Sequence, residues 1–521
     1  WIYNAHDNVW RDGIQTDQSR QILVTVASTP GSAVLEVDDV ILGVIAADSG
    51  SVPLFSSDCR KAFGAAITDA EKTGAGTLRV KRWRAGTTTD VNIPMTIMGD
   101  YSSTAPYDCP KSEAILAAAR IQLVSELIAD PNFLTTDWKG SISGLALLAG
   151  VAPGDADYDT VQSRLQTFAQ TLAGQTPNPE ILLIWDWAYI ALFLSEYYLR
   201  TGDANALPGV NAYTLALANG QSRYGTFGHN GVLKDDDGVA FDRGGYGAVN
   251  SAGIAANISI VVGKKALLAG GQIIDPEIDT AIQRGADYFA SYVNRGSIPY
   301  GEHEPWMTHD SNGKNPMCAV LFGLQDSRLA ETEYFARMTI AGYPGRESGH
   351  TGPGFSYLWE AMAANMGGPN AVAKYLQQVR WHLDLTRRTN GSFVFDDSEN
   401  FGASKTADGT YLGDTGYYGL NPTAIYILSY ALPMQRLNIT GKNADPVPLL
   451  DSNKVDNALA AATYHLDCPA HITNELIAAL SEFDPLVRDS AAIELATRTL
   501  TGTEINTLLA MVTDPDANAR M

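Results

Sequence analysis

The stretch YGTFGHNGVLKDDDGVAFDRGGYGAVN (Tyr224–Asn250) runs directly into the apolar segment SAGIAANISIVVGKKALLAGG (Ser251–Gly271). The second segment combines apolar residues at helical spacing with many small side chains, which predicts a closely packed helix. The first contains seven glycines together with His229, Arg243 and Tyr246, and glycine-rich segments of this kind form loops. The sequence therefore predicts a helical scaffold in which a polar loop opens onto a buried helix.

Two further loops of the same kind follow along the chain. PYGEHEPWMTHDSNGKNP spans Pro299–Pro316, and YPGRESGHTGPGFSY spans Tyr343–Tyr357. Binding and catalytic groups are commonly carried on loops above a rigid scaffold. We predict that the three loops face one cleft, because they hold four of the eight histidines of the chain: His229, His303, His309 and His350. This concentration favours an enzyme.

The helical pattern covers most of the chain. From residue 113 to residue 434, twelve segments carry apolar residues at i, i+3 and i+4 spacing. The connections between them alternate between short and long, which is typical of paired inner and outer helices. We therefore predict an all-α region over residues 113–445, folded as an (α/α) toroid, that is, an incomplete barrel of helical hairpins. A compact helical bundle is the alternative.

The residues before this region predict a different class of structure. The segments RQILVTVAST, DVILGVIA, GTLRVKRWRA and VNIPMTIMG alternate or run apolar between turn residues, as strands do. One predicted helix, CRKAFGAAITDAEKTG, interrupts them. We predict a β-rich domain over residues 1–100, joined to the helices by the Pro/Ser-rich linker YSSTAPYDCPKS at residues 101–112.

A repeated motif marks the C-terminal part of the chain. Asp-Pro followed by Arg occurs at residues 484–488 and again at residues 514–520. This pattern is typical of HEAT-like helical repeats, which stack in arrays. We predict such repeats over residues 446–521, with a structural role. We expect the array to continue past Met521, and residue 1 to be a trimmed or mature end because it is not Met.

Composition excludes several classes of function. The formal net charge of −22 argues against general nucleic-acid binding, which needs a basic face. No apolar run approaches the roughly 20 residues of a membrane span, so we predict no transmembrane segment. The cysteines lack CxxC spacing, which excludes a zinc ribbon. The four are Cys59, Cys109, Cys318 and Cys468; Cys59 and Cys109 could form a disulfide, and two free buried thiols are the alternative for this pair.

The residue types in the three loops suit elimination from a uronic acid. The proton next to an ionised carboxylate is weakly acidic, so a lyase must neutralise the carboxylate while a base removes that proton. The candidate bases and acids are Tyr246, His229, His309 and His350. The candidate substrate-binding residues are Arg243, Asn250, His303, Lys314, Asn315 and Arg346, with Trp306, Tyr417 and Tyr418 for sugar stacking.

Other chemistries remain open on the same loops. A glycoside hydrolase needs two facing carboxylates, and the candidates are Asp186, Asp242, Glu302, Glu304 and Asp310. The segment KDDDG at residues 234–238 weakly resembles a calcium loop without the distal Glu of an EF-hand. His303, His309 and His350 could bind zinc. Elimination requires neither metal.

Two resemblances add to this interpretation. STPGSAVLEVDDVILGVIA, a helix and GTLRVKRWRAGTTTDVNIPM together resemble a protease-type PDZ domain, which implies a peptide ligand or a docking role. The whole order, with FGHNG, DRGGYG and SGHTGPGFSYLW in the helical region, resembles a bacterial family of large secreted proteins that includes a polysaccharide lyase family active on ulvan.

The second resemblance implies a secreted or periplasmic enzyme. Its reaction would be β-elimination on an anionic polysaccharide that contains uronic acid, whereas the residue roles given above rest on chemistry and clustering alone. The negative net charge opposes a polyanionic substrate unless the cleft is locally basic. A glycoside hydrolase and a non-enzymatic envelope scaffold that binds peptides are the two alternative functions.

Overall fold

The computed structural model describes residues 2–4, 21–24, 27, 29–56, 58–177, 183–229, 247–309, 312–346, 354–394, 420–442 and 448–513. The chain divides into two compact units, each assembled from separate parts of the sequence. Unit 1 contains Trp1–Asp130, Thr351–Gly354 and Ala373–Pro433, and unit 2 contains Pro131–His350, Phe355–Val372 and Met434–Met521.

Unit 1 begins with a five-stranded antiparallel sheet in which each strand pairs with the next along the chain. The strands are β1 (Ile2–Asn4), β2 (Ile22–Val24), β3 (Val40–Ile45), β4 (Thr77–Arg84) and β5 (Thr87–Pro94). The prediction of a small β domain followed by a mostly helical chain is confirmed.

One helix, α1 (Cys59–Ala70), completes the core of this sheet. The Asp58 side chain accepts hydrogen bonds from two main-chain N–H groups of the first turn, which fixes where α1 begins. Phe63 and Ile67 of α1 pack with Ile41 and Leu78 of the sheet, and all four are buried. Apolar residues at i and i+4 on α1 therefore face the sheet, as an amphipathic helix requires.

The same core extends into the helical part of unit 1. Leu385 and Trp381, on α12 (Pro369–Thr386), pack against the sheet and α1. Gly64 of α1 lies so close that a Cβ there would come within 2.1 Å of the Trp381 carbonyl oxygen. Any side chain at this position would push the two helices apart.

Two other helices of unit 1 pack on each other. They are α2 (Pro110–Ala129) and α13 (Pro422–Tyr430). Asn421 caps α13 by accepting from Thr423 N and Ala424 N, and its amide donates to the Glu126 carboxylate of α2 at 2.8 Å. One side chain thus fixes both the start of α13 and its position against α2.

A buried cluster of charges connects α1, α2 and α12 within unit 1. Arg387 donates to both carboxylate oxygens of Glu71 at 2.6 Å, and Lys111 Nζ lies 2.9 Å from Glu71 and 3.8 Å from Asp384. The hydroxyl of Tyr101 donates to Asp384 at 2.9 Å. Burial, followed by the charge of Asp384, raises the pKa of Tyr101 well above its ordinary value. Tyr101 and Lys111 both come from the segment predicted as a linker.

Unit 2 is helical. Its first nine helices are α3 (Trp138–Gly150), α4 (Tyr158–Ala173), α5 (Ile184–Thr201), α6 (Leu207–Gly220), α7 (Asn250–Ala269), α8 (Pro276–Ala290), α9 (Lys314–Gly323), α10 (Leu329–Ala341) and α11 (Gly354–Met366). Short 3-10 helices in the two units span Gly31–Ala33, Ala204–Ala206, Tyr343–Gly345, Leu432–Met434, Asn438–Thr440 and Cys468–Ala470.

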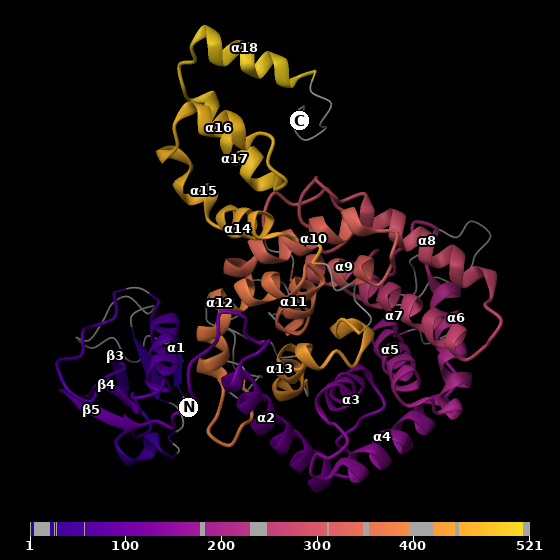
Figure 1. The fold of residues 1–521 in the computed structure, drawn as a ribbon, viewed down its shortest axis with the longest axis horizontal. Helices are drawn as coiled ribbons and strands as arrows, with labels where there is room; N and C mark the ends of the chain where they lie inside the picture. Colours follow the sequence, from indigo (N-terminus) through magenta and orange to yellow (C-terminus); the bar gives the residue numbers. More distant parts are fainter. Residues whose placement is uncertain are drawn as a thin grey trace. The chain divides into compact units, whose positions relative to one another are not determined.

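Alternate helices of unit 2 form two layers. Helices α3, α5, α7 and α9 pack in succession on one another, and α4, α6 and α8 pack in succession outside them (Figure 1). Small residues allow the close approach between helices: Gly144 of α3 contacts the Phe193 ring of α5, and Gly263 of α7 contacts Thr214 of α6. This arrangement explains why short and long connections alternate between consecutive helices of unit 2.

Helix α7 is long and apolar enough to cross a membrane by length and composition, and it is the one such helix among the described residues. Of its most apolar window, 78% is buried inside the protein. It packs against α5, α6, α8 and α9. The helix therefore has the environment of a core helix.

Five more helices complete unit 2. They are α14 (Ser452–Ala461), α15 (Tyr464–Asp467), α16 (Thr473–Ala479), α17 (Pro485–Ala496) and α18 (Gly502–Met511). Helix α14 packs on α10, and α17 packs on α15 and α16. The second copy of the Asp-Pro…Arg motif, at residues 514–520, lies outside the described residues.

The state of the cysteines decides between a disulfide and free thiols. Cys59, Cys109, Cys318 and Cys468 are all buried thiols. The disulfide considered between Cys59 and Cys109 is therefore wrong, and the alternative of buried thiols is confirmed. Cys59 Sγ instead donates to the main-chain carbonyl of Gln21 at 3.3 Å.

Candidate functional site

The N-terminal ends of α3, α5, α7, α9 and α11 meet at one end of unit 2, which we call the helix-start face. Ile184 N, at the start of α5, donates to the His229 carbonyl, and Val249 N, before α7, donates to the Phe227 carbonyl. A Cβ on Gly313, before α9, would lie 2.7 Å from the main chain of Phe355 in α11. Because each helix start carries a partial positive charge, this face favours an anion.

Three aromatic rings form a platform on the helix-start face. Trp185 stacks on Phe355 with ring centroids 5.0 Å apart and an interplanar angle of 18°. Trp138 lies 6.3 Å from Trp185 and 6.0 Å from Phe355. Trp138 and Trp185 are half-buried, whereas Phe355 is buried. The accessible parts of Trp138 and Trp185 suit stacking on a sugar ring. No sequence motif marks these three residues.

His229 is held by the platform. The indole N–H of Trp185 donates to His229 Nδ1 at 3.1 Å. An indole is a donor only, so Nδ1 must be unprotonated and the neutral imidazole must carry its proton on Nε2. Burial lowers the pKa of His229, which also favours the neutral ring. Of the two predicted catalytic residues that the structure describes, His229 and His309, His229 is the one at the platform.

Asp186 follows Trp185 at the start of α5. Its carboxylate accepts a hydrogen bond from the main-chain N–H of Trp138 at 3.1 Å. Burial, supported by the charge of Asp137, raises the pKa of Asp186. Of the other hydrolase candidates that the structure describes, Glu302 and Glu304 are exposed.

Asn250 joins two of the predicted loops. It is completely buried, and its amide donates to the carbonyls of Pro299 (3.1 Å) and Gly301 (2.9 Å). Its carbonyl oxygen accepts from the Thr226 hydroxyl at 3.2 Å. Both amide hydrogens are thus used on the main chain, so the geometry gives Asn250 a structural position rather than one that contacts substrate.

The loop from 297 to 309 carries two predicted binding residues, and the first two residues of α9 are two more. Trp306 is 38% exposed, and His303 is exposed. Lys314 is buried, with its ammonium 5.8 Å from the centroid of the Trp306 ring. Asn315 is also buried; it donates to the Ser297 hydroxyl at 2.9 Å and accepts from Ile298 N at 3.2 Å. The loop is therefore fixed from below by the first residues of α9.

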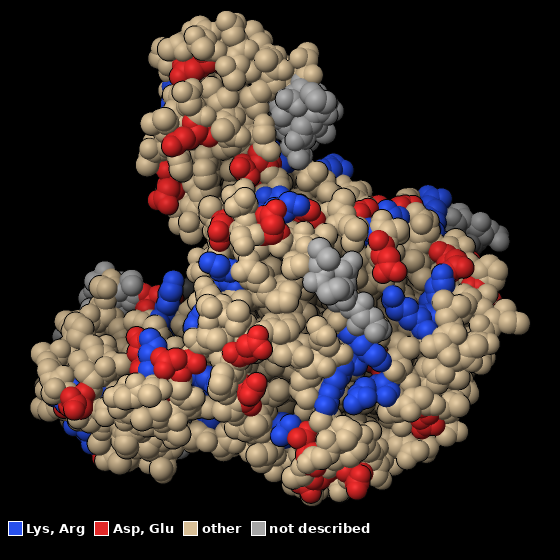
Figure 2. Space-filling view, viewed as in Figure 1, with Lys and Arg blue, Asp and Glu red and all other residues tan. Residues whose placement is uncertain are grey.

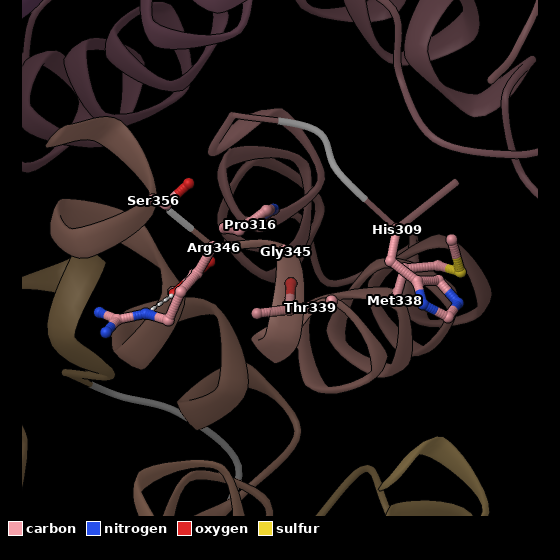
Figure 3. Close-up of a pocket in the computed structure, with 9 residues that line it drawn as sticks. His309, Pro316, Met338, Thr339, Gly345, Arg346 and Ser356 are labelled. Carbon is pink, nitrogen blue, oxygen red and sulfur yellow. Dashed lines mark hydrogen bonds and ion pairs between the residues drawn. The ribbon is translucent and has the colours of Figure 1, made fainter. Parts of the chain in front are cut away.

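His309 and Arg346 lie around a separate, very small cavity. Its volume is about 10 Å³, the size of one water molecule. Figure 3 shows the two side chains on opposite sides of this space, with the guanidinium pointing away from His309. Arg346 Nε donates to Glu360 at 3.0 Å, and the guanidinium lies 4.3 Å from the Tyr357 ring centroid. As lined by the described residues, this cavity is too small to hold a sugar ring.

His309 contacts the C-terminal helices. Its Nε2 lies 2.5 Å from the carboxylate of Asp484, and both side chains are buried. Asp484 also caps α17, and Arg488 donates to the Asn294 carbonyl at 2.5 Å. The Asp-Pro…Arg motif thus holds both ends of the loop that carries Trp306.

Basic side chains lie at the opposite ends of the inner helices. Arg436 donates to the carbonyl of Val151, at the end of α3, and Lys442 donates to the carbonyl of Leu199 in α5 at 3.0 Å. Figure 2 shows Lys and Arg side chains gathered over α3 and α5 on the visible face. Cations at helix C-termini are stabilised by the helix dipole, which explains these positions without a ligand.

Several predicted residues lie outside the described residues. They are Arg243, Tyr246, His350, Tyr417 and Tyr418, with the hydrolase candidates Asp242 and Asp310 and the calcium segment at residues 234–238. Within the described ranges, no group of three or more His, Cys, Asp or Glu side chains is placed to hold a metal ion. His303 and His309 differ in burial, and their predicted zinc partner His350 is among the undescribed residues.

Comparison with known families assigns the helical region. A family model described as a domain of unknown function, DUF6288, matches residues 112–441. The chain belongs to that family. The matched residues include every helix of the helix-start face and leave out the five-stranded sheet and helices α14 to α18. Comparisons with curated proteins and with solved structures return no match.

Proposed function

We propose that this protein is a secreted or periplasmic polysaccharide lyase that cleaves a uronic-acid-containing, ulvan-like polymer by β-elimination at the helix-start face. The observation that carries the proposal is His229 held by Trp185 beside the aromatic platform, at the point where five helix N-termini meet. A neutral donor, a stacking surface and a positive local potential together match a uronate sugar.

The tautomer of His229 refines its role. With the proton on Nε2, the neutral imidazole donates a hydrogen bond, either to the substrate carboxylate or to the departing oxygen. In this assignment the base that removes the proton is a different group, for which Tyr246 and His350 remain the candidates. Arg243 remains the candidate for charge neutralisation, and Asn250 would act by holding the loops.

We also propose the finer architecture expected from the sequence. The two layers of alternate helices support an (α/α) toroid within the family domain. A small antiparallel sheet with one helix supports a PDZ-like N-terminal domain. The stacking of α15, α16 and α17, with Asp484 as the cap of α17, supports HEAT-like repeats.

The direct test is near-ultraviolet absorbance of the unsaturated uronate product during incubation with a panel of uronate polymers, ulvan foremost. The lyase proposal expects a rise with at least one polymer. The His229→Ala variant should lose most of it, by on the order of 100-fold, as for removal of a hydrogen-bond donor that stabilises the transition state. His465→Ala is the matched control, because this exposed histidine lies on α15, outside the residues that the family model matches, and its loss should leave the rate unchanged.

A glycoside hydrolase is the second candidate, favoured by the raised pKa of Asp186. A carboxyl that stays protonated can act as the general acid of glycoside cleavage. New reducing ends without ultraviolet absorbance, lost in Asp186→Asn, would select this function over the lyase. Absence of both signals on every polymer would favour the non-enzymatic scaffold.

A further inference from the structure

The hairpin that follows α12 carries an Asn-Gly pair at its tip. Arg387 and Phe393 form an antiparallel bridge, and Gly391 N donates to the carbonyl of Arg388 at 3.0 Å, which closes a tight turn between them. Asn390 is exposed in this turn, and Gly391 has a φ of +89°. Because glycine has no Cβ, its main-chain nitrogen is the least hindered one that can follow an asparagine. This nitrogen can therefore react with the side-chain amide of Asn390.

Ser392 activates the side-chain amide of Asn390. The Oδ1 atom of Asn390 accepts a hydrogen bond from Ser392 N at 3.1 Å and another from the Ser392 hydroxyl at 2.8 Å. Attack on the amide carbon places negative charge on this oxygen, and two donors already aimed at it stabilise that charge, as in an oxyanion hole. The contact with the main chain two residues on also folds the side chain back over the turn. The amide is thus both polarised and held near Gly391 N.

We propose that Asn390 is a site of spontaneous deamidation, with water as the co-reactant. The hydrogen bond from Gly391 N to Arg388 opens, as bonds in exposed turns do readily. Hydroxide removes the proton from Gly391 N, and this nitrogen bonds to Cγ of Asn390, which closes a succinimide ring. The Cγ–Nδ2 bond breaks, and Nδ2 takes a proton from water and leaves as ammonia. A second water opens the ring at either carbonyl, which leaves aspartate or isoaspartate at this position.

The isoaspartate product disturbs the packing of the hairpin on α2. A Cβ on Gly391 would lie 2.5 Å from the carbonyl oxygen of Ala118 in α2, so the main chain of the turn lies in close contact with this helix. Isoaspartate lengthens the main chain before Gly391 by one methylene group, and a closely packed contact has no space for it. The hairpin should therefore lift from α2, and unit 1 should loosen with the age of the protein.

Two other Asn-Gly pairs in the described part of the chain serve as internal references. Asn219 and Gly220 lie in the last turn of α6, where the helix fixes the main chain. Asn312 is buried beside Gly313, directly before α9. Ring closure needs the main chain to rotate, and both environments oppose this rotation.

The test is peptide mass spectrometry of the folded full chain during incubation at mildly alkaline pH. The side-chain amide of Asn390 should be lost several-fold faster than those of Asn219 and Asn312, with a rate that rises in proportion to hydroxide concentration. Electron-transfer fragmentation separates isoaspartate from aspartate in the product. In urea the three pairs should react at similar rates, because glycine follows each asparagine and the fold is absent.

Variants of the same turn test the role of Ser392. Ser392→Ala removes the hydroxyl donor and should slow the loss of the Asn390 amide several-fold. Thr389→Ala is the matched control, because its hydroxyl donates to the carbonyl of Thr29 and not to Asn390. Thermal unfolding establishes that both variants are folded during the incubation. In the aged native protein, hydrogen exchange should rise around Ala118 in α2.

Three outcomes would overturn the proposal. The first is loss of the amide at Asn390 that is no faster than at Asn219 in the folded chain. The second is the same ranking of the three pairs in urea, which would remove the fold as the cause. The third is an equal rate in the Ser392→Ala and Thr389→Ala variants. The proposal is independent of the lyase, because the hairpin contributes no residue to the helix-start face.

Discussion

The pair formed by Trp185 and His229 illustrates how single residues define the chemistry of the helix-start face. His229 stands out in the sequence because it lies in a glycine-rich loop among other histidines. Trp185 does not stand out, because it lies 44 residues earlier and belongs to no motif. The signal that could have found the platform is an aromatic residue at the start of each of three helices: Trp138, Trp185 and Phe355.

We predict that Trp185→Phe changes the protonation of His229. The phenyl ring preserves stacking on Phe355 but removes the N–H that stabilises unprotonated Nδ1, so the pKa of His229 should rise. Nitrogen NMR of the imidazole through a pH titration measures both the pKa and the tautomer. If the enzyme is a lyase, kcat should fall by about tenfold while KM changes little. An unchanged tautomer would contradict the assignment.

We predict a pH-dependent gain in stability for Asp186→Asn. The folded-state pKa of Asp186 is raised, so its contribution is most favourable at low pH and is lost as pH rises through the folded pKa. The amide keeps an acceptor for Trp138 N and does not ionise. The variant should therefore gain thermal stability relative to the native protein as pH increases from about 3.8, the ordinary pKa, to neutrality. A stability difference that is constant with pH would be the contrary result.

At the scale of elements, helical periodicity predicted the helices well because each apolar face packs against a neighbour. The alternation of layers in unit 2 also followed from loop lengths. Periodicity carried no information on which end of a helix meets which loop. The Asp-Pro…Arg motif was assigned a structural role from its pattern, but its contacts with Asn294 and His309 are too distant in sequence to be predicted locally.

We predict that Asp484→Ala loosens the loop from 297 to 309. The change removes the cap of α17 and leaves His309 buried without its carboxylate, at a combined cost of about 3 kcal/mol. Hydrogen exchange of this loop should rise severalfold. Asp451→Ala is the control, because Asp451 caps α14 in the same way without contacting the loop. Equal hydrogen exchange of the loop in the two variants would show that the contact between Asp484 and His309 does not stabilise the loop.

At the scale of the whole molecule, the order of a β domain and a long helical region was predictable from the switch of hydrophobic period. The set of chain segments that assemble into unit 1 was not predictable from the sequence. Its core includes α12, which comes almost 300 residues after the sheet in the sequence. The segment expected as a linker contributes half-buried Tyr101 and buried Lys111 to the charge cluster. Proline and serine content indicated a loop correctly but gave no sign that its polar residues would be buried.

We predict that the charge cluster makes unit 1 unfold as one body. Asp384→Ala leaves Lys111 and Arg387 buried with one carboxylate fewer, which should cost about 3–5 kcal/mol in urea unfolding. The sheet and the helices α2 and α13 should lose hydrogen-exchange protection together. Asp69→Ala removes an exposed ion pair with Lys72 and should cost less than about 1 kcal/mol. Separate unfolding of the sheet would refute this coupling.

The contact of Gly64 with the carbonyl of Trp381 has a consequence for how the protein is made. The sheet and α1 leave the ribosome before α12, yet Trp381, Leu385 and Arg387 complete their core and neutralise their buried charge. Until residue 387 has been synthesised, the part of this core that Trp381 and Leu385 cover stays exposed. The nascent sheet domain therefore stays incompletely packed, and accessible to chaperones, while most of the helices of unit 2 are translated.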